Sequence, residues 1–290
     1  MDETIGVIAD STADLPSGLA KKKNIHLIPI HILVNNQDHL HGVNIVNQEV
    51  VEHLKQKHDV STSPPFPGEY TENYQKMMRR YDRVYSFHVS KELSNCYSSA
   101  NNSLELLGEQ VSSAIHIIDT RTVSIAQGQI VNRIAGIARN NPDTQRLNQY
   151  INWLVKHSML FFVVDNLFWL KRAGKLNMLS SIFGKMLDIK PVIGMDNGVL
   201  TPIEKCRGKE SAVEGLIRGV QKGAATLLNQ RKDVEIWVGH SDTLLGATQI
   251  QEQLCGIFKK EKSAVPIVEM GPTMTAHTGP GCLCVSLLPR

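Results

Sequence analysis

The sequence predicts an α/β protein made of two lobes. Short apolar runs alternate with amphipathic segments along the chain, and this alternation is typical of a mainly parallel sheet with helices on both faces. The rhythm changes near residues 140–157, where two predicted helices follow each other without a strand between them. We therefore expect a single unit over residues 1–290, with an N-terminal α/β lobe over 1–157 and a second α/β lobe over 158–290.

Four apolar runs in the first lobe have the length of strands, and polar turns separate them from helical segments. Three prolines within Val60–Gly68 exclude a helix or a central strand, so an extended loop that presents hydroxyl groups is predicted there. The predicted strands are Ile5–Ala9, His26–Val34, Val84–Val89 and Ala114–Asp119, with a hairpin turn at Asn35–Asp38; the predicted helices follow Pro16, cover Asn47–Lys57 and Gly68–Arg80, open at Ser94, cover Thr122–Asn140 and end at Lys156.

The second lobe has a less regular order. Asp196-Asn197-Gly198 is a strong signal for a tight turn between two paired strands. Glycines and prolines bracket His277 and Thr278 within Gly271–Gly281, which we expect to be a rigid closing loop. The other predicted elements are strands at Met159–Val164, Val199–Cys206, Val234–His240 and up to Leu288, and helices at Asn166–Arg172, Ser180–Leu187, Gly208–Gln230 and Leu245–Phe258.

The composition is that of an ordinary soluble globular protein. Hydrophobic residues make up 42% and charged residues 20% of the 290 residues, and the net charge of +3 does not favour a nucleic-acid partner. No apolar run is long enough to cross a bilayer, and the acidic start Met1–Thr4 is unlike a signal peptide. Five scattered cysteines form no C-x-x-C pair, which favours free thiols and a cytoplasmic location.

The segment Val84–Ala100 is the strongest local indication of a binding site. An alternating strand is followed by a polar turn, and Ser94 and Asn95 then precede a helix. Ser and Asn cap helix starts, and a helix start suits an anion because it carries unpaired N–H donors and partial positive charge. The segment therefore predicts a seat for a negatively charged group, and an ordinary N-cap is the alternative that this stretch alone leaves open.

Three polar turns of the first lobe are expected near one edge of its sheet. They hold Asp10, Thr62 and Ser94, and each precedes a predicted helix. Ligands of such sheets bind outside the carboxyl ends of the strands. His277, set among glycines and prolines, is a further candidate. These residues indicate a hydroxyl-lined anion site with one histidine and nearby cations.

The sequence contains no complete catalytic set. Neither a glycine-rich P-loop nor an H-E-x-x-H motif is present, so nucleotide binding and metal-assisted hydrolysis are not favoured. A stand-alone acyl hydrolase remains an alternative, with Ser94 or Cys96 as the nucleophile, His277 as the base and Asp10 or Asp119 as the group that orients it. Against this alternative, Ser94 does not lie in a G-x-S-x-G elbow.

A series of short motifs resembles those of the DegV family of bacterial fatty-acid-binding proteins over nearly the full length of the chain. Each motif is weak alone, and their number and order make the resemblance specific. They are Ile8–Pro16, Ser61–Pro65, Leu93–Ala100, Leu170–Leu176, Asp188–Pro191, Asn197-Gly198 and Ala276–Gly281.

The resemblance implies a two-lobed α/β protein that binds a long-chain fatty acid, such as a C16–C18 acid, and needs no cofactor. The carboxylate would lie between the lobes and be held by Thr62 and Ser94, and the acyl chain would run into an apolar tunnel. The residues that would support the site are Ser63, Asn95, Arg172, Lys175, His277 and Thr278.

The resemblance also implies that the chain is a lipid-binding protein and not an enzyme. In family members that work with a kinase, the protein presents the bound acid for phosphorylation to an acyl phosphate in phospholipid metabolism, and ATP belongs to the kinase. Such a role involves no nucleic acid and no transmembrane segment, and it is compatible with transient contact with a membrane surface.

Elementary chemistry agrees with a fatty-acid ligand. A carboxylate accepts strong, charge-assisted hydrogen bonds from hydroxyl groups and from N–H groups at a helix start. Burial of the acyl chain contributes about 0.8 kcal/mol for each methylene group. The acyl chain would therefore contribute most of the binding free energy, and the carboxylate head group would fix the position of the ligand in the site.

Three positions depart from the family pattern. Asn95 stands where the family usually has glycine, and it adds a side chain where the carboxylate would approach the backbone. Pro64 replaces a glutamine, and Lys175 replaces an arginine, so a planar, bidentate clamp is lost. We expect fatty-acid binding to be retained, and we expect these changes to bear on the coupling to a kinase.

Overall fold

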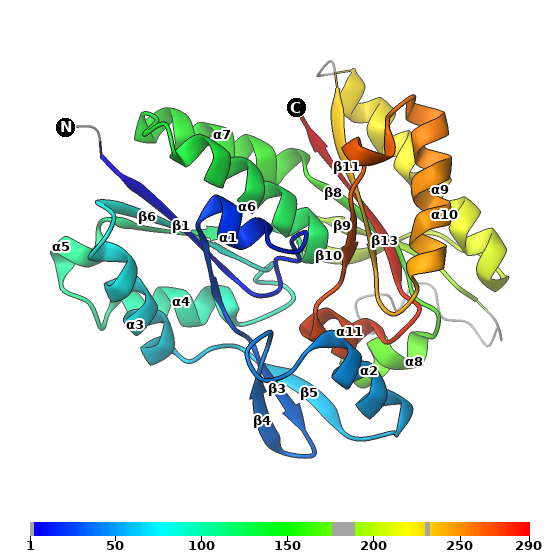
Figure 1. Ribbon diagram of the computed structural model, residues 1–290, viewed down its shortest axis with the longest axis horizontal. Helices are drawn as coiled ribbons and strands as arrows, with labels where there is room; N and C mark the ends of the chain where they lie inside the picture. Colours follow the sequence, from blue (N-terminus) through cyan, green and yellow to red (C-terminus); the bar gives the residue numbers. More distant parts are fainter. Residues whose placement is uncertain (1–2, 176–188, 230–232) are drawn as a thin grey trace.

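The computed structural model of the protein describes residues 3–175, 189–229 and 233–290. Within these residues the strands form three sheets, of four, six and three strands. The two larger sheets lie on either side of a central helix, and the small sheet lies below them in the view of Figure 1. This α/β architecture agrees with the predicted fold class.

The four-stranded sheet is parallel throughout, as predicted for the first lobe. Its strands, in order across the sheet, are β2 (Ile25–Ile28), β1 (Ile5–Asp10), β6 (Arg83–His88) and β7 (Ile115–Asp119). Helices α3 (Pro67–Met78) and α4 (Cys96–Leu104) pack against one face. Their contact with the sheet is a buried cluster that includes Ile8, Tyr70, Tyr74 and Ala100.

Helix α6 (Ser124–Ala138) is the central helix of the molecule (Figure 1). It buries 11 of its 15 residues, which is typical of a helix enclosed on all sides. One side packs on β1, and the other packs on β11 (Val234–His240) and β13 (Leu283–Pro289). Helix α7 (Thr144–His157) lies beside it and completes the same core with Leu147 and Ile151.

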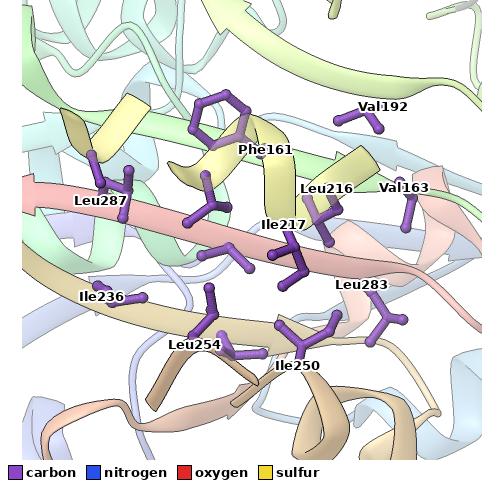
Figure 2. Close-up of a cluster of buried hydrophobic side chains, with 14 of the residues drawn as sticks. Phe161, Val163, Val192, Leu216, Ile217, Ile236, Ile250, Leu254, Leu283 and Leu287 are labelled. Carbon is purple, nitrogen blue, oxygen red and sulfur yellow. The ribbon is translucent and has the colours of Figure 1, made fainter. Parts of the chain in front are cut away.

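The six-stranded sheet is mixed. Its strands, in order, are β10 (Val199–Glu204), β9 (Val192–Asp196), β8 (Met159–Val163), β13, β11 and β12 (Ile267–Glu269). The pair β11–β12 is parallel, and the other neighbouring pairs are antiparallel. Helices α9 (Gly208–Leu228) and α10 (Leu244–Phe258) cover its outer face through an apolar core around Phe161, Leu216 and Leu254 (Figure 2).

The small sheet is antiparallel and carries part of the candidate site. Its central strand β3 pairs with β4 on one side and with β5 on the other. Residues of α2, β3, β5 and α11 share a small core. The bounds of these elements and of those not yet given are β3 (His31–Val34), β4 (Gln37–Leu40), β5 (Val60–Ser63), α2 (Asn47–Lys55), α11 (Pro272–Thr278), α1 (Leu19–Lys23), α5 (Glu109–Ser112), α8 (Leu167–Arg172) and a 3-10 helix (Lys262–Ala264).

Two predictions about the first lobe are wrong. His26–Val34 is not one strand, because it divides into β2 and β3, which belong to different sheets. Pro29 lies at the break, where its missing N–H cannot join a ladder. The predicted loop at Val60–Gly68 begins with strand β5, because its prolines start only at Pro64 and leave the first four residues free to pair.

The prediction of a closing loop at Gly271–Gly281 is also wrong, since helix α11 occupies most of this segment. Pro272 stands in the first helical turn, where a proline is tolerated, and Gly279 ends the helix with a φ of 71°. The glycines and prolines therefore mark the two ends of a helix. The predicted helix at 180–187 lies outside the described residues. The division into lobes at 157/158 falls between α7 and β8 and stays a prediction.

Candidate functional site

The candidate site is a cavity of about 280 Å³ whose wall is built from both halves of the chain. This volume is close to the lower end of the range of about 300–1,000 Å³ that ligand pockets occupy. Its polar lining residues are Thr12, Thr62, Ser63, Ser94, Asn95, Ser124, Lys175, Thr273, His277 and Thr278. Its other lining residues are Ile30, Pro64, Val89, Leu93, Val123, Leu160, Phe162, Leu170, Ala173, Leu200, Met270, Met274 and Cys284.

Thr62 and His277 form one polar pair of the wall. Thr62 lies on β5 and His277 on α11, and Thr62 Oγ1 is 2.8 Å from His277 Nε2. Burial, with a smaller effect from the positive charge of Lys175, lowers the pKa of His277 to about 4. The ring is therefore neutral at pH 7. Its buried Nδ1 has no hydrogen-bond partner among the described residues.

Of the described lysines, Lys175 is the one that lines the cavity. It follows the end of α8, and its Nζ donates a hydrogen bond to the carbonyl oxygen of Leu93. Burial lowers the pKa of Lys175 below its ordinary value of 10.5. Partial desolvation strengthens the attraction between this ammonium group and an anion, because water screens the charge less. None of the ion pairs that the structure records in its described part includes Lys175.

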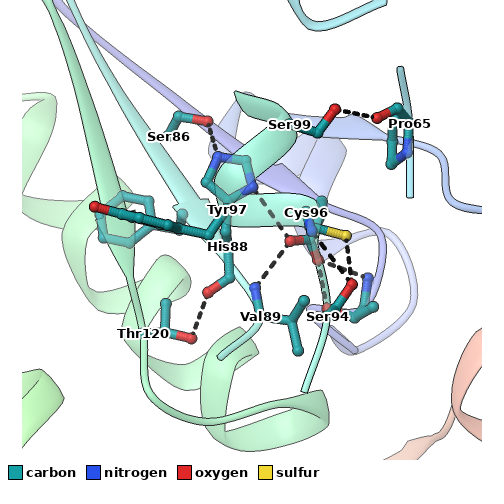
Figure 3. A network of polar contacts seen from close by, with 12 residues as sticks. Pro65, Ser86, His88, Val89, Ser94, Cys96, Tyr97, Ser99 and Thr120 are labelled. Atoms are coloured by element: carbon teal, nitrogen blue, oxygen red, sulfur yellow. Dashed lines mark hydrogen bonds and ion pairs between the residues drawn. The ribbon is translucent and has the colours of Figure 1, made fainter. Parts of the chain in front are cut away.

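Ser94 lies just before helix α4, in the turn that follows β6. Its Oγ accepts a hydrogen bond from the backbone N–H of Cys96 at 3.3 Å and lies 3.1 Å from Cys96 Sγ (Figure 3). Asn95 takes the N-cap position, but its side chain makes no cap hydrogen bond. The serine hydroxyl and the start of α4 thus face the cavity together, with Asn95 at the same wall.

A fully buried polar network fixes this turn from behind. Asp10 Oδ2 accepts a hydrogen bond from the N–H of Val89 at 2.9 Å and lies 3.3 Å from His88 Nδ1. His88 Nε2 contacts Ser86 Oγ at 2.7 Å (Figure 3). Burial alone would raise the pKa of Asp10, but contacts from His88, Thr12 and Val89 outweigh it and lower the pKa. The network therefore anchors the segment that leads from β6 to Ser94.

Strands of the six-stranded sheet supply part of the apolar wall. Leu160 and Phe162 alternate along β8 and point to the same side, and Leu200 of β10 lies near them in one buried cluster. Met270 and Met274 add flexible, unbranched side chains to the same cluster. This wall has the chemistry to bury an alkyl chain beside the polar end.

The structure brings most of the predicted site residues together. The cavity is lined by Thr62 and Ser94, which were predicted to hold the carboxylate. It is also lined by five of the six predicted supporting residues, which are Ser63, Asn95, Lys175, His277 and Thr278. Arg172 points elsewhere, because its guanidinium group donates to the carbonyl oxygen of His58 and pairs with Asp59 at 2.9 Å.

Three hydroxyl groups of the wall were not predicted from the sequence. They belong to Thr12, Ser124 and Thr273. Thr12 lies in the polar turn after β1. The sequence predicts this turn near the edge of the sheet, so the position of Thr12 in the turn could have identified it as a site residue. Ser124 begins a helix and Thr273 lies within a segment predicted to be a loop, and nothing in their local sequence indicates a cavity.

The geometry does not favour the alternative of an acyl hydrolase. Within the described part of the chain no hydrogen bond joins Ser94 to His277, whose Nε2 contacts Thr62 instead. Asp10 is engaged with His88 and Val89, and Asp119 Oδ1 accepts from the N–H of Arg121 at 2.9 Å. Neither carboxylate orients His277, so the nucleophile, base and orienting group of such an enzyme are not connected.

Over residues 3–175, 189–229 and 233–290, no group of three or more His, Cys, Asp or Glu side chains is arranged to hold a metal ion. Within the same residues, no helix combines the length and the apolar character that crossing a membrane requires.

Comparison with known proteins gives a consistent picture. The family model described as "Uncharacterised protein, DegV family" matches residues 4–290. The protein DegV of Bacillus subtilis is 26% identical over 286 residues, which cover 96% of this chain and 97% of that protein. This relative is a bacterial protein.

Two solved structures share the fold. A DegV family protein of Thermus thermophilus, described by its fatty-acid binding, is 21% identical, with a TM-score of 0.89 over 99% of this chain and 100% of that chain. A stearic-acid-binding protein of Eubacterium ventriosum is 19% identical, with a TM-score of 0.89 over 99% of this chain and 98% of that chain. Since the family model covers almost all of the sequence, the chain belongs to the DegV family.

Proposed function

We propose that this protein binds a long-chain fatty acid and acts as its carrier. The observation that carries the proposal is a single cavity whose wall combines hydroxyl groups and a half-buried lysine with aliphatic and aromatic side chains. A fatty acid has the same two-part chemistry. The Thermus thermophilus and Eubacterium ventriosum proteins, which share the fold, are described as binding a fatty acid and stearic acid respectively.

The carboxylate is held by Thr62 and Ser94, with Lys175 as its counter-ion. A neutral His277 that carries its proton on Nε2 donates to Thr62 Oγ1, and the Thr62 hydroxyl then donates to the carboxylate. Ser94 Oγ accepts from the N–H of Cys96, and its own proton is donated to the ligand while the Cys96 thiol, 3.1 Å away, acts as the donor in the contact between the two side chains. Each such bond to a charged group contributes about 1.5–3 kcal/mol.

The acyl chain lies against the apolar wall, which includes Leu160, Phe162 and Leu200. Burial of each methylene group contributes about 0.8 kcal/mol, so a chain of 16 to 18 carbons is held mainly by this wall. Ser63, Asn95 and Thr278 support the polar end of the site. Arg172 has no direct role in this proposal, because it is engaged with Asp59.

The binding of palmitate to the purified, delipidated protein tests this assignment. Thr62→Val and Ser94→Ala each remove one hydroxyl group, and each is expected to weaken binding about tenfold or more, since tenfold corresponds to about 1.4 kcal/mol. Ser113→Ala is the matched control, because Ser113 is exposed at the end of α5 and does not line the cavity. Unchanged affinity in both site variants would show that the carboxylate lies elsewhere.

We further propose, on the family resemblance, that the protein presents the bound acid to a separate kinase and does not itself use ATP. The support is that Ser94 and Lys175, which the proposal puts beside the carboxylate, line the cavity in connecting segments of the chain, and that the sequence has no P-loop. Conversion of bound palmitate to palmitoyl phosphate by this chain and ATP alone would contradict the proposal; the acyl phosphate can be trapped with hydroxylamine.

A further inference from the structure

Asp14 is a buried carboxyl group directly behind the cavity wall. The residue is only 5% exposed to solvent. Its Oδ2 accepts a hydrogen bond from Ser124 Oγ at 2.6 Å, and its Oδ1 accepts one from the backbone N–H of Gly271 at 2.8 Å. Ser124 lines the cavity, and Gly271 is the N-cap of α11, which carries His277. Asp14 therefore joins two walls of the site.

The position of Asp14 is fixed by close packing. A Cβ atom at Gly128 would lie 2.1 Å from the carbonyl oxygen of Asp14, so α6 rests directly on the Asp14 backbone and only glycine fits there. This backbone contact and the hydrogen bonds with Ser124 and Gly271 together hold the carboxyl group in place. A change in its protonation can then be met by a rearrangement of hydrogen atoms within the same contacts.

Among the described residues, the groups that act on Asp14 include no neutralising cation. Asp10 adds a like charge, and the thiols of Cys282 and Cys284 stay protonated because burial raises their pKa values. The His41 ring faces Gly271 from the β4–α2 connection, and burial lowers the pKa of His41 to about 4. Burial raises the pKa of Asp14 to about 7, although the bonds from Ser124 and Gly271 oppose this rise. Both protonation states are therefore populated near neutral pH.

We propose that Asp14 and Ser124 form a proton-linked switch in the cavity wall, an inference that rests on the proposed fatty-acid function. An ionised carboxylate can only accept, so the Ser124 hydroxyl must point its hydrogen atom at Asp14 and offer lone pairs to the cavity. A protonated Asp14 donates to Ser124 Oγ instead, while its other oxygen still accepts from Gly271. The hydrogen atom of Ser124 is then free to point into the cavity and donate to an anionic head group.

The switch couples ligand binding to proton uptake. A bound carboxylate repels an ionised Asp14 and is attracted to the freed Ser124 hydroxyl, so binding raises the pKa of Asp14 above its value in the empty protein. The complex then holds a proton that the empty protein has lost. By linkage, the affinity is greatest below pH 7 and falls as the pH rises above 7 towards the higher pKa of the complex.

Calorimetric titration of the delipidated protein with dodecanoate tests the switch. Dodecanoate stays below its micelle concentration and remains ionised between pH 6 and pH 8.5. For the wild type, the affinity is expected to fall at least threefold between pH 7 and pH 8.5. Near pH 7.5, buffers of different ionisation enthalpy should reveal the uptake of a fraction of a proton.

Two variants separate the switch from a merely structural role. Asp14→Asn keeps the acceptor for Gly271 and donates permanently to Ser124, so its affinity should stay within twofold over the whole pH range, without proton uptake. Ser124→Ala should weaken binding several-fold at pH 6.5 and less at pH 8.5. Glu72→Gln, which changes an exposed carboxylate on α3, is the control and should behave as the wild type does.

The possible failures differ for the two proposals. If Lys175 rather than Asp14 caused the pH dependence, the wild type and Asp14→Asn would lose affinity alike, so a pH dependence that is the same in this variant and in the wild type overturns the switch. Binding by the wild type without proton uptake overturns it as well, and both results leave the fatty-acid function intact. Absence of dodecanoate and palmitate binding at every pH would overturn both proposals.

Discussion

His277 has a different chemical role from the one that its sequence context suggests. A histidine among glycines and prolines is a candidate base, but burial and Lys175 lower its pKa to about 4. Above about pH 5 the ring carries no charge, so among the described lining residues the positive charge comes from Lys175. In the proposed function His277 orients the hydroxyl group of Thr62, which lies 2.8 Å away.

Asp14→Asn is expected to change how the stability of the protein depends on pH. The folded protein holds a proton on Asp14 up to a pKa of about 7, whereas an unperturbed aspartate has a value of 3.8. The stabilisation from this carboxyl group is complete below about pH 4 and is lost as the pH rises to 7. Relative to the wild type, the free energy of unfolding of the variant should rise by about 1.4 kcal/mol for each pH unit in this window.

Urea denaturation at pH 5, 6, 7 and 8 measures this difference. Other titrating groups, including Asp10 with its lowered pKa, are common to both proteins and cancel in the comparison. The difference should level off above pH 7. A difference that is the same at pH 5 and pH 7 would show that Asp14 is ionised throughout in the folded protein.

The sequence predicts site residues where local chemistry marks them. Ser94 is marked by a strand followed by a helix start, and Thr62 by a segment with hydroxyl groups and prolines. Ser124 is different, because it becomes a wall residue only when α6 packs between two sheets, and its partner Asp14 lies far away in the chain. No local pattern reports such a contact, so the bridge from Asp14 to Ser124 becomes visible only in the folded protein.

Helix α11 shows that the same residues support two interpretations at the level of an element. Glycines and prolines around His277 are compatible with a loop, but Pro272 and Gly279 suit the first turn and the end of a short helix. The helix matters because it places Thr273, His277 and Thr278 on the cavity wall. It also buries Met274 and Ala276, which a surface loop would leave exposed.

Gly279→Ala is expected to destabilise the protein by about 2–4 kcal/mol, since backbone strain and overpacking each cost about 1–3 kcal/mol. Gly279 has a φ of 71°, which alanine rarely adopts, and a Cβ atom there would lie 2.0 Å from the Trp169 ring. The end of α11 would have to shift away from α8. Urea denaturation with a tryptophan fluorescence readout measures the loss directly.

Gly256→Ala is the matched control for this variant. Gly256 lies in α10, and a Cβ atom there meets nothing within 4 Å. Alanine in an unobstructed helix should leave the stability unchanged or raise it by up to about 1 kcal/mol. Equal stabilities of the two variants would show that the contact between α8 and α11 is looser than described.

Strand β10 offers a test of the apolar wall. Leu200→Trp adds a large ring to a residue that lines the cavity and is 5% exposed, so it is expected to fill space that the acyl chain needs. Palmitate affinity should fall at least tenfold, which corresponds to about 1.4 kcal/mol. The far-ultraviolet circular dichroism spectrum checks that the fold is kept.

Ile203→Trp on the same strand is the control, because Ile203 is 47% exposed and lies outside this cavity. It should bind palmitate as the wild type does. If Leu200→Trp folds and binds palmitate with unchanged affinity, the acyl chain does not use this wall.

On the scale of the whole molecule, the parallel sheet could be predicted and the mixed sheet could not. Strands and helices alternate along the first lobe, and a strand–helix–strand succession itself implies parallel neighbours. In the second sheet, the last strand of the chain, β13, lies between β8 and β11 and runs antiparallel to both. Such pairing joins segments that are distant in sequence, and no local periodicity specifies it.

The order of the strands also explains how the cavity forms. β13 brings the end of the chain back to the centre of the six-stranded sheet, next to α6, and α11 precedes it directly. The cavity wall therefore combines the turns after β1 and β6 with segments from the last quarter of the chain. The complete site depends on the docking of both halves.

The most direct test of the fatty-acid function is denaturing mass spectrometry of an organic extract from freshly purified protein. The proposed function predicts a long-chain fatty acid in roughly equal molar amount to the protein, and the spectrum would identify its length and saturation. The same extract from Leu200→Trp should contain much less. An extract without fatty acid, together with a failure of the delipidated protein to take up added palmitate, would contradict the proposed function.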